Sequence, residues 1–466
     1  MKEFNAQLAE NHSIRSFFES KRCLIISPLQ MVRVMARKLA TNVGISATQI
    51  DMVNNFHEAQ KLMREKKHQI VIAEYYLGDR VALDMVVNGE AGVDIVQHEG
   101  KNKYGLDLLE LHQEIYPNRL NSIFTIISDY KSQNVAYKCY EADVELFLGK
   151  PLSYEALETG FLKAVDKKLY ADDTMKEIEN VKAYMAKGDF MMAHQVLGLI
   201  KEHNLSSAEL NYYEGLIYSR EKKYGMAINA LRIAYDFDNF HYKSLSLLYD
   251  TLFLDGQYTE AYKYGQSLSQ NFPINPNRLP TFVKVALANQ SYDDVIHFCQ
   301  IFMELDDKDP AISKQLSAGL IVSGKVLAEN GEVERATLNF KKAAEFCQGE
   351  KKVILNALEG LLSVKAVKDI GSILGKIYEE KKELDQDYLI IKLKGILIEG
   401  SFGEALTMGL DLLNKKIKTP DVYIVCLEAS ISIGRRKEAV EELFENALKA
   451  FPEHRKKFEA ILADTV

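Results

Sequence analysis

The hydrophobic positions of residues 174–466 follow a helical period and recur as a repeating unit. In the best-defined unit, residues 205–239, the pattern predicts two short amphipathic helices joined by a turn near Lys222. Small residues stand where the two helices face each other, Gly215 in the first and Ala227 in the second. Because helix axes approach to about 8–10 Å only when the contacting side chains are small, the pattern predicts a closely packed helix pair.

The position of Ala227 recurs along the chain at a nearly constant interval. Successive members lie 34 residues apart, except for one step of 41 and one of 35. A glycine often stands five residues earlier, where a tight turn between helices uses the left-handed backbone conformation. The recurring positions are Ala193, Ala227, Ala261, Val295, Ala336, Ile370, Ala405 and Ala439. Such a period predicts a solenoid in which each helix pair buries its apolar face only against its neighbours.

These residues resemble the tetratricopeptide repeat family, and the resemblance covers residues 174–466. It implies an all-helical solenoid of about eight helix pairs that binds protein partners. Val295 and Ile370 depart from the family by replacing the small residue of the second helix, and the chain has no Trp, which the family uses in the first helix. The alternative is a generic helical bundle, which the near-constant interval does not favour.

The resemblance also implies a binding groove along the first helices of the pairs. Tetratricopeptide proteins that bind a carboxyl-terminal peptide line this groove with a Lys/Asn/Arg set, which is missing here. Aromatic and basic side chains stand there instead and suit an amphipathic helix or an extended peptide. The candidate groove residues are Tyr212, Tyr213, Phe253, Lys284 and Lys325. The alternative is that some of these rings belong to the core between repeats.

Residues 21–170 show a different pattern, in which short apolar runs alternate with amphipathic helical stretches. This α/β alternation predicts a five-stranded parallel sheet covered by helices on both faces. The predicted strands are Cys23–Ile26, Gln49–Val53, Gln69–Ala73, Ser122–Ile127 and Glu145–Leu148. In such sheets the functional crevice lies beyond the carboxyl ends of the strands, so the residues there are the candidates for a site.

The strand ends of this region resemble those of the receiver domain of bacterial response regulators. Glu74 ends the third strand, where the family has its phosphoacceptor Asp, and Ser128 matches the switch Ser/Thr. Phe147 matches the switch aromatic, and Lys150, which a proline follows, matches the Lys of the family's Lys-Pro pair. The resemblance implies a flavodoxin-like strand order and a homodimer through the last strand and the last two helices.

The first strand end departs from the family, because Ser27 and Pro28 replace the pair of acids that holds Mg²⁺. A hard divalent cation requires carboxylate oxygens, and phosphoryl transfer needs the metal to neutralise developing charge. We therefore expect neither a bound metal nor phosphorylation. Two interpretations of Glu74 stay open: a fixed ion pair with Lys150 or contact with Ser128 that holds this face in one state, or an exposed acid at a loop start. For Ser128 and Lys150 a purely structural role is the alternative.

Two further segments flank or interrupt this domain. Residues 78–104 form an insertion whose Asn88-Gly89 pair predicts a hairpin, and it would cover the former phosphorylation pocket. Residues 1–20 predict a short amphipathic helix that packs on the receiver-like domain or on a partner. No Pro/Gly/Ser linker separates the domain from the repeats, which favours a rigid junction.

Composition narrows the classes of function. The formal net charge is −8, whereas a nucleic-acid-binding face is basic, so no nucleic-acid partner is expected. The five cysteines are scattered without a CxxC motif, which is typical of a reducing cytoplasm. No run of about 18 apolar residues predicts a membrane span. The motifs GxSxG, HExxH, GxxxxGK and GxGxxG are all missing, so we expect no enzyme and no cofactor.

The leading hypothesis is a non-catalytic bacterial signalling adaptor in the cytoplasm. Its receiver-like domain presents a fixed face without accepting phosphate, and its solenoid binds a protein partner. One alternative is a response regulator that accepts phosphate on Glu74 or a neighbouring acid and gates the solenoid. The other is a chaperone or assembly factor in which the receiver-like part is only a cap.

Overall fold

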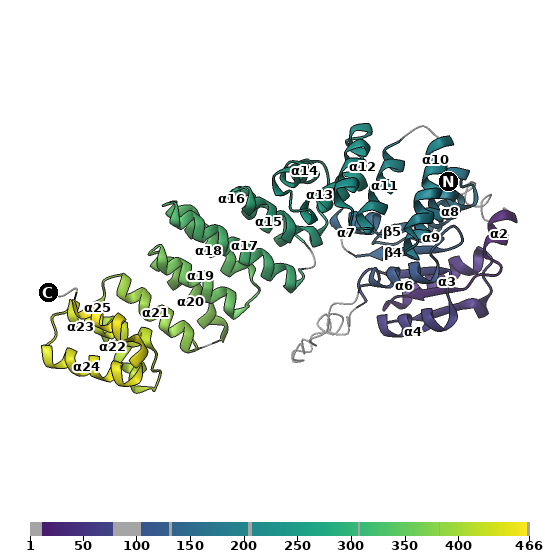
Figure 1. Ribbon diagram of the computed structural model, residues 1–466. Coiled ribbons are helices and arrows are strands. Elements are labelled where there is room, and N and C mark those ends of the chain that lie inside the picture. The colour runs from purple at the N-terminus through teal and green to yellow at the C-terminus, as the bar shows by residue number, and fades with distance from the viewer. Residues whose placement is uncertain are drawn as a thin grey trace. The chain divides into compact units, whose positions relative to one another are not determined.

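The chain forms two compact units, Met1–Pro276 and Asn277–Val466 (Figure 1). The first contains the sheet and three helix pairs, and the second contains five further pairs. The computed structural model describes residues 12–77, 104–129, 133–203, 207–305, 308–381 and 383–463. The predicted hairpin at Asn88-Gly89 and nearly all of the 78–104 insertion therefore lie outside the described residues, as does much of the predicted 1–20 helix.

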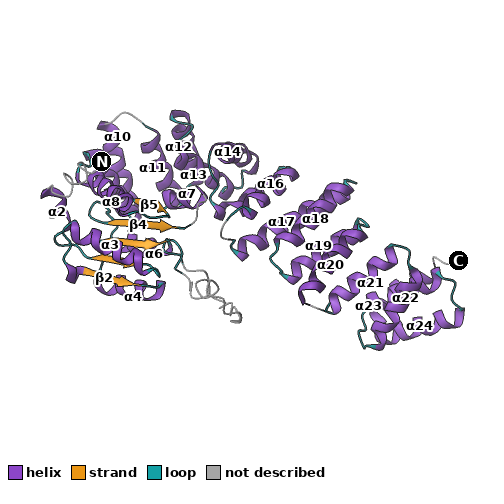
Figure 2. Ribbon diagram, turned by 180° about the vertical axis from the view of Figure 1, so that it is seen from behind, coloured by secondary structure: helices purple, strands orange, loops and turns teal. Residues whose placement is uncertain are grey.

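The first unit is built on a five-stranded sheet with the order β2-β1-β3-β4-β5 (Figure 2). Every neighbouring pair of strands is parallel. The strands are β1 (Cys23–Ile26), β2 (Ile50–Val53), β3 (Ile70–Glu74), β4 (Ile123–Ser128) and β5 (Leu146–Gly149). This order confirms the predicted flavodoxin-like parallel sheet, and it brings the carboxyl ends of β1, β3, β4 and β5 to one edge.

Helices cover both faces of the sheet. One face packs on α3 (Gln30–Asn42) and α8 (Tyr154–Leu169), and the other on α4 (Phe56–Lys66), α6 (Asp107–Ile115) and α7 (Gln133–Glu141). Alternate strand residues divide between the two faces, as the period of two requires. Cys23, Ile25, Ile70 and Ile72 belong to the first core, and Leu24, Ile26, Val71 and Ala73 to the second.

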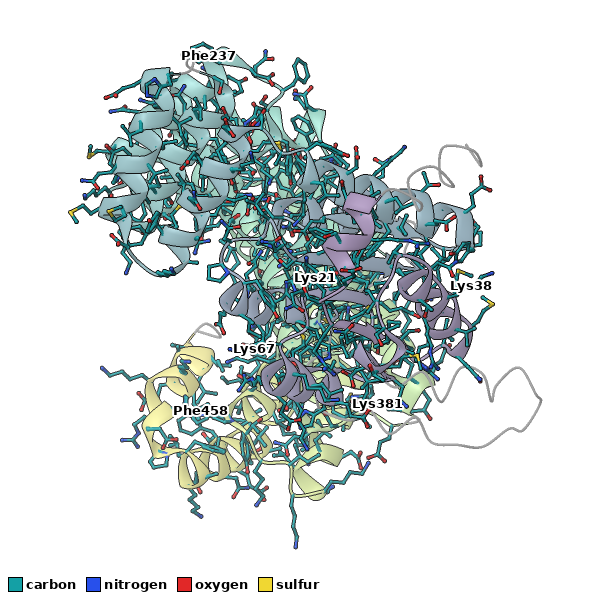
Figure 3. The ribbon with its side chains drawn as sticks, turned by 90° about the vertical axis from the view of Figure 1, so that its right-hand side faces the viewer. Lys21, Lys38, Lys67, Phe237, Lys381 and Phe458 are labelled. Carbon is teal, nitrogen blue, oxygen red and sulfur yellow. The ribbon has the colours of Figure 1, made fainter. Side chains whose placement is uncertain are left out.

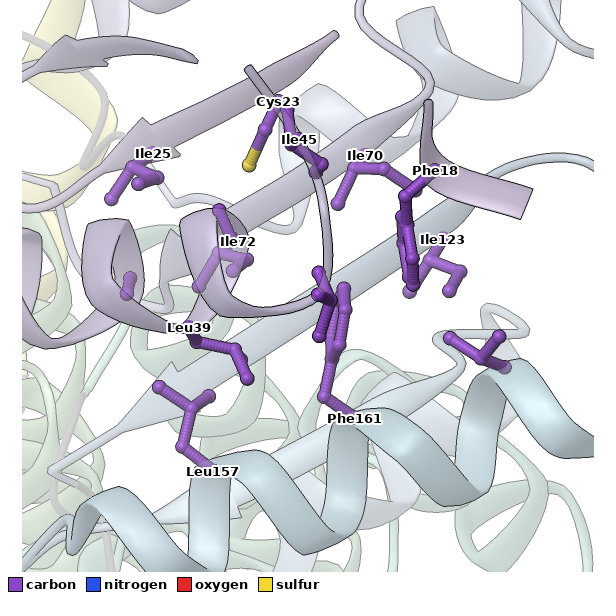
Figure 4. Packing of buried hydrophobic residues seen from close by; sticks show 14 of the residues in the cluster. Phe18, Cys23, Ile25, Leu39, Ile45, Ile70, Ile72, Ile123, Leu157 and Phe161 are labelled. Carbon is purple, nitrogen blue, oxygen red and sulfur yellow. The ribbon is translucent and has the colours of Figure 1, made fainter. Parts of the chain in front are cut away.

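The described end of the amino-terminal helix, α2 (His12–Phe18), packs on the sheet domain. Phe18 is fully buried, and its ring stacks on that of Phe161 in α8 with centroids 5.6 Å apart (Figure 4). Burying an aromatic side chain of this size contributes roughly 1.5–3 kcal/mol. Of the two predicted destinations for this segment, the described residues therefore take the sheet domain.

Eight helix pairs follow the sheet within the described residues, and a last helix, α25 (Arg455–Ala463), follows them. The pairs of the first unit are α9 (Asp173–Ala186) with α10 (Phe190–His203), α11 (Ala208–Arg220) with α12 (Tyr224–Phe237), and α13 (Tyr242–Leu254) with α14 (Tyr258–Asn271). The pairs of the second unit are α15 (Leu279–Ala288) with α16 (Tyr292–Met303), α17 (Pro310–Glu329) with α18 (Val333–Phe346), α19 (Lys351–Ser363) with α20 (Val367–Lys381), α21 (Gln386–Ile398) with α22 (Phe402–Asn414), and α23 (Pro420–Ser432) with α24 (Lys437–Ala450). The predicted helical solenoid is confirmed in this sense.

The recurring small position has a structural cause. Seven of its eight members are buried, and only Ala439, in the last pair, is half-buried. A Cβ added to Gly215 would lie 2.5 Å from Leu231 Cγ, so α11 and α12 approach too closely for any side chain there. The last pair is covered by α25, whose Phe458 is fully buried (Figure 3).

A residue with a left-handed backbone stands five positions before each of the eight recurring positions. Its φ lies between 59° and 84° at all eight turns: Gly188, Lys222, Gly256, Gln290, Gly331, Lys365, Gly400 and Gly434. The turn therefore has one backbone geometry throughout, and glycine fills it at five of the eight places. The three exceptions show that the geometry, and not the glycine, is the constant feature.

Gly400→Ala is expected to destabilise the second unit by about 1–2 kcal/mol, because an L side chain is strained at φ 84°. Nothing lies within 4 Å of the added Cβ, so the loss would come from the backbone alone. The matched control is Gly371→Ala, which also meets nothing within 4 Å but lies inside α20, where Ala is favoured by roughly 0.5–1 kcal/mol. Urea unfolding compares the two, and a loss of stability in both variants would contradict the turn geometry.

Helix α12 exposes three large apolar side chains, Met226, Ile233 and Phe237. Figure 3 labels the last of them. Among the described residues, no helix is long and apolar enough to cross a membrane.

Candidate functional site

The buried carboxylate of Glu74 lies where the carboxyl ends of β1, β3 and β5 meet. The side chain of Ser27, after β1, donates its hydroxyl proton to Oε1 of Glu74. The ammonium group of Lys150, after β5, lies 2.8 Å from Oε2 of Glu74. Glu74 is only 2% exposed, so its interpretation as an exposed acid at a loop start is wrong. The ion pair with Lys150, which the sequence left as one of two interpretations, is present.

A second acid shares the same lysine. Asp129 Oδ1 lies 2.7 Å from Lys150 Nζ, so one ammonium group stands between two carboxylates. The backbone N–H of Lys150 donates a hydrogen bond to the carbonyl of Ser128, with 2.8 Å between nitrogen and oxygen, and this holds the backbone of Lys150 in place. Ser128 itself is buried at 1% exposure. Phe147 is half-buried and packs against the core beneath α4, α6 and α7.

The loop after β1 is fixed by its own hydrogen bonds. The backbone N–H of Ser27 donates to the carbonyl of Val53, and Ser27 Oγ accepts a bond from Leu29 N at 3.0 Å. Arg33, on α3, donates to the carbonyl oxygens of Ser27 and of Pro28. Ser27 and Pro28 thus form a neutral, hydrogen-bonded turn. A guanidinium group stands beside this turn, where a metal site would need acids.

The chain returns to Glu74 at the far end of the insertion. Gly105 N donates to the carbonyl of Tyr75 at 2.7 Å, and a Cβ on Gly105 would lie 2.1 Å from the carbonyl oxygen of Glu74. Tyr76 and Tyr104 form an isolated antiparallel bridge. The two described ends of the insertion are therefore joined beside the Glu74 site, and only Gly fits at this approach.

A second set of polar contacts joins the end of α7 to the helix pairs of the same unit. The hydroxyl of Tyr242, at the start of α13, donates to Glu141, and Asn275 Nδ2 lies 2.6 Å from the other carboxylate oxygen of Glu141. Lys243 donates to Asp143, and Lys182 of α9 lies 3.3 Å from that carboxylate. These contacts link segments about a hundred residues apart in the sequence.

The electrostatics of this contact favour the ionised forms. Burial would raise the pKa of Asp143, but Lys182 and Lys243 lower it to about 2. Burial alone would lower the pKa of Lys182, but the carboxylate of Asp143 raises it above its ordinary value. Asp143 also has a left-handed backbone, with φ 61°, a conformation that Asp and Asn adopt more readily than most other residues. The carboxylate is thus placed by this turn and held by two lysines.

A third cluster ties the sheet to α8 and α9. Glu145 pairs with Arg119 and with Lys168, whose Nζ lies 2.7 Å from Glu145 Oε1. The backbone N–H of Arg119 donates to Glu179 of α9 at 3.1 Å. These contacts bond the sheet domain directly to the first helix pair, and the rigidity of the junction stays a prediction.

Two of the predicted groove residues lie in this region rather than along an open groove. Tyr213 is buried at 5% exposure, and Lys182 Nζ stands 5.7 Å from the centre of its ring. Burial raises the pKa of both Tyr212 and Tyr213 above the ordinary value. Both line a cavity of about 450 Å³, whose other wall includes Tyr140 and Glu145 of the sheet domain. The first helices of these pairs therefore face the chain's own sheet domain.

The other three groove candidates lie elsewhere. Phe253 is half-buried in α13, and its ring contacts that of Tyr258 with centroids 5.7 Å apart. Lys284 of α15 and Lys325 of α17 are exposed and belong to the second unit. The implied homodimer would use the last strand and the last two helices of the receiver-like domain. Part of that face, at Glu141 and Asp143, is covered by α9 and α13.

Sequence reasoning missed the residues that make these contacts. Asp129 directly follows Ser128 at a strand end, so the rule that selected Ser128 would have found it. Glu141 and Asp143 give no comparable signal, because two acids after a helix are the usual composition of a solvated surface. Among the described residues, no cluster of three or more His, Cys, Asp or Glu side chains has the spacing to hold a metal ion.

No family model and no curated protein matches the chain. Its structure is similar to a tetratricopeptide repeat protein from Parabacteroides merdae, with 13% identity and a TM-score of 0.27, over 63% of this chain and 98% of that one. The C-terminal part of a TPR repeat-containing protein from Cytophaga hutchinsonii is 14% identical with a TM-score of 0.31, over 50% of this chain and 92% of that one. PilF of Pseudomonas aeruginosa is 14% identical with a TM-score of 0.22, over 53% of this chain and 94% of that one. Values this low carry no argument about function, and the repeats are assigned from the chain's own period and helix pairs.

Proposed function

We propose that this protein is a non-catalytic adaptor of bacterial signalling, with a receiver-like domain that does not use phosphate and helical repeats that bind a protein partner. The order of the strands and the residues at their ends support the receiver-like assignment. The 34-residue period of helix pairs supports a role in protein binding, since stacked helix pairs present extended surfaces to other proteins. The free cysteines, all buried, suit a cytoplasmic setting.

The observation that carries the proposal is the state of Glu74. Both oxygens of its carboxylate are engaged, one by the hydroxyl of Ser27 and the other by the ammonium group of Lys150. Phosphoryl transfer to a carboxylate needs a free oxygen and a divalent cation beside it. Here Ser27 and Lys150 already engage both oxygens, and Ser27 and Pro28 offer a cation no carboxylate, so the face is held in one state by a fixed charge. The domain then acts as a constant surface for contact.

The test is incubation of the full chain with acetyl phosphate or beryllofluoride in the presence of Mg²⁺. We expect no gain of mass and no shift of the thermal midpoint with either reagent. A gain of one phosphoryl group that disappears in Glu74→Gln would overturn the proposal and establish the alternative, a phosphorylatable response regulator. A midpoint that rises with beryllofluoride and Mg²⁺ together, but with neither alone, would do the same.

A further inference from the structure

The contact at the end of α7 resembles the recognition of a bound helix. Four donors from three separate segments converge on two carboxylates: Tyr242 and Asn275 on Glu141, and Lys182 and Lys243 on Asp143. Two of these donors carry charge, and charge-assisted hydrogen bonds are the stronger class. Each carboxylate thus has its own pair of donors, which is a specific arrangement rather than a general attraction between charged surfaces.

Aromatic rings define the rest of this contact. The ring of Tyr137 meets that of Tyr242 edge-on with centroids 4.9 Å apart, and it lies 6.2 Å from Phe272. Lys243 Nζ stands 4.9 Å above the ring of Tyr140. Residues three and four apart share one side of a helix, so Tyr137, Tyr140 and Glu141 form one stripe of α7. The surface opposite α7 therefore contacts the pattern Tyr-x-x-Tyr-Glu-x-Asp of residues 137–143.

The contact is not sealed from solvent. An open cavity of about 450 Å³ lies beside it, and Tyr140, Asp143, Lys182 and Lys243 are among the residues that line it. Tyr140 remains 52% exposed although its ring takes part. A polar contact beside an open cavity, with an exposed tyrosine ring, has the character of an interface between domains rather than of a close-packed core. Figures 1 and 2 both show α7 beside α13, at the margin of the sheet domain.

We propose that the surface formed by α9, α13 and the segment after α14 is a binding site for an acidic aromatic helix, and that α7 is its resident occupant. A partner that presents two tyrosines and two carboxylates in the spacing of residues 137–143 binds there by displacing α7. This inference rests on the proposed adaptor function and adds the chemistry of the partner. It also makes the sheet domain an internal competitor for that partner.

The test uses the full chain and a fluorescent peptide of residues 133–145 that carries Cys139→Ser. The variant Glu141→Gln/Asp143→Asn weakens the resident helix, and Asn tolerates the left-handed backbone at position 143. Fluorescence anisotropy is expected to show that this variant binds the peptide at least about tenfold more tightly than the wild type, because a tethered competitor acts at millimolar effective concentration. A peptide with the same two replacements is expected to bind at least about tenfold more weakly.

Two further variants complete the test. Lys243→Met also loosens the contact, but it removes a donor of the proposed site instead of an acceptor on α7. The peptide is therefore expected not to bind this variant. Glu110→Gln/Glu114→Gln removes two exposed acids from α6 and is expected to behave as the wild type. Circular dichroism establishes that each variant is folded. If the Glu141→Gln/Asp143→Asn chain is unfolded, the single variant Glu141→Gln replaces it, because it weakens the resident helix and leaves all four donors of the surface in place.

Three outcomes would overturn the inference. The first is a folded, weakened chain that binds no peptide, and the second is equal binding of the charged and neutralised peptides. The third is that the wild type is a dimer and the Glu141→Gln/Asp143→Asn variant is a monomer. That result would mean that α7 of a second copy occupies this surface. Each of these leaves the proposed adaptor role intact, because no phosphodonor is used. Phosphorylation of Glu74 would instead overturn the adaptor role and leave the peptide result unchanged.

Discussion

Lys150→Met is expected to lower the free energy of unfolding of the first unit by about 3 kcal/mol. The substitution removes the cation that neutralises Glu74, whose side chain is buried at the end of β3. A buried carboxylate without a counter-charge is strongly destabilising, whereas Met keeps the length and the apolar stem of the lysine. Thermal unfolding at neutral pH, followed by circular dichroism, measures the loss as a lower midpoint.

The matched control is Lys163→Met, which removes an exposed lysine from α8 and is expected to change stability by less than about 0.5 kcal/mol. The double variant Lys150→Met/Glu74→Gln removes the orphaned carboxylate and is expected to regain most of the lost stability. A Lys150→Met chain as stable as the control would mean that Glu74 does not depend on Lys150. The fixed-charge account of the receiver-like face would then fail.

The parts of the fold that a local rule determines could be predicted from the sequence. The position of Ala227 repeats because each helix pair meets its neighbour in the same way, so one unit predicts all eight. The strand ends converge because parallel strands point the same way, so the sequence alone predicts that Ser27, Glu74 and Lys150 lie at one edge of the sheet. Whether Glu74 would be buried depended on the side chains around it, and so two interpretations stayed open.

The contact of α7 with α13 could not be predicted, because it depends on the placement of two elements about a hundred residues apart. Nothing in the run Glu141-Ala142-Asp143 distinguishes it from an ordinary solvated helix end. The groove assignment of Tyr213 assumed that the first helices of the pairs face solvent or a partner. In the first unit they face the chain's own sheet domain, and the tyrosine is buried there.

Phe340 shows how far the small residues of the repeats set the packing of the second unit. Its ring is fully buried in α18 and is wedged between two glycines, Gly324 of α17 and Gly360 of α19. A Cβ added at Gly360 would lie 2.4 Å from the ring, and one added at Gly324 would lie 2.7 Å from the same ring edge. The ring therefore has no room to move away from either helix.

Gly360→Ala is accordingly expected to destabilise the second unit by about 1–3 kcal/mol, the usual effect of overpacking. Phe340→Ala is expected to lose about 3–5 kcal/mol by leaving a cavity. In a Phe340→Leu background, which frees the ring edge and keeps an apolar side chain, Gly360→Ala is expected to stabilise α19 by roughly 0.5–1 kcal/mol, since Ala is favoured over Gly inside a helix.

This reversal of sign is the decisive measurement, and urea unfolding of the four chains of the cycle provides it. If only helix propensity mattered, Gly360→Ala would change the free energy of unfolding with the same sign in both backgrounds. Only contact with the ring makes that sign depend on residue 340. Gly375→Ala, which meets nothing within 4 Å in α20, is the matched control and is expected to stabilise both backgrounds equally. If Gly360→Ala destabilises the Phe340→Leu chain as much as the wild type, the close approach of α18 and α19 has another cause than the fit of this ring.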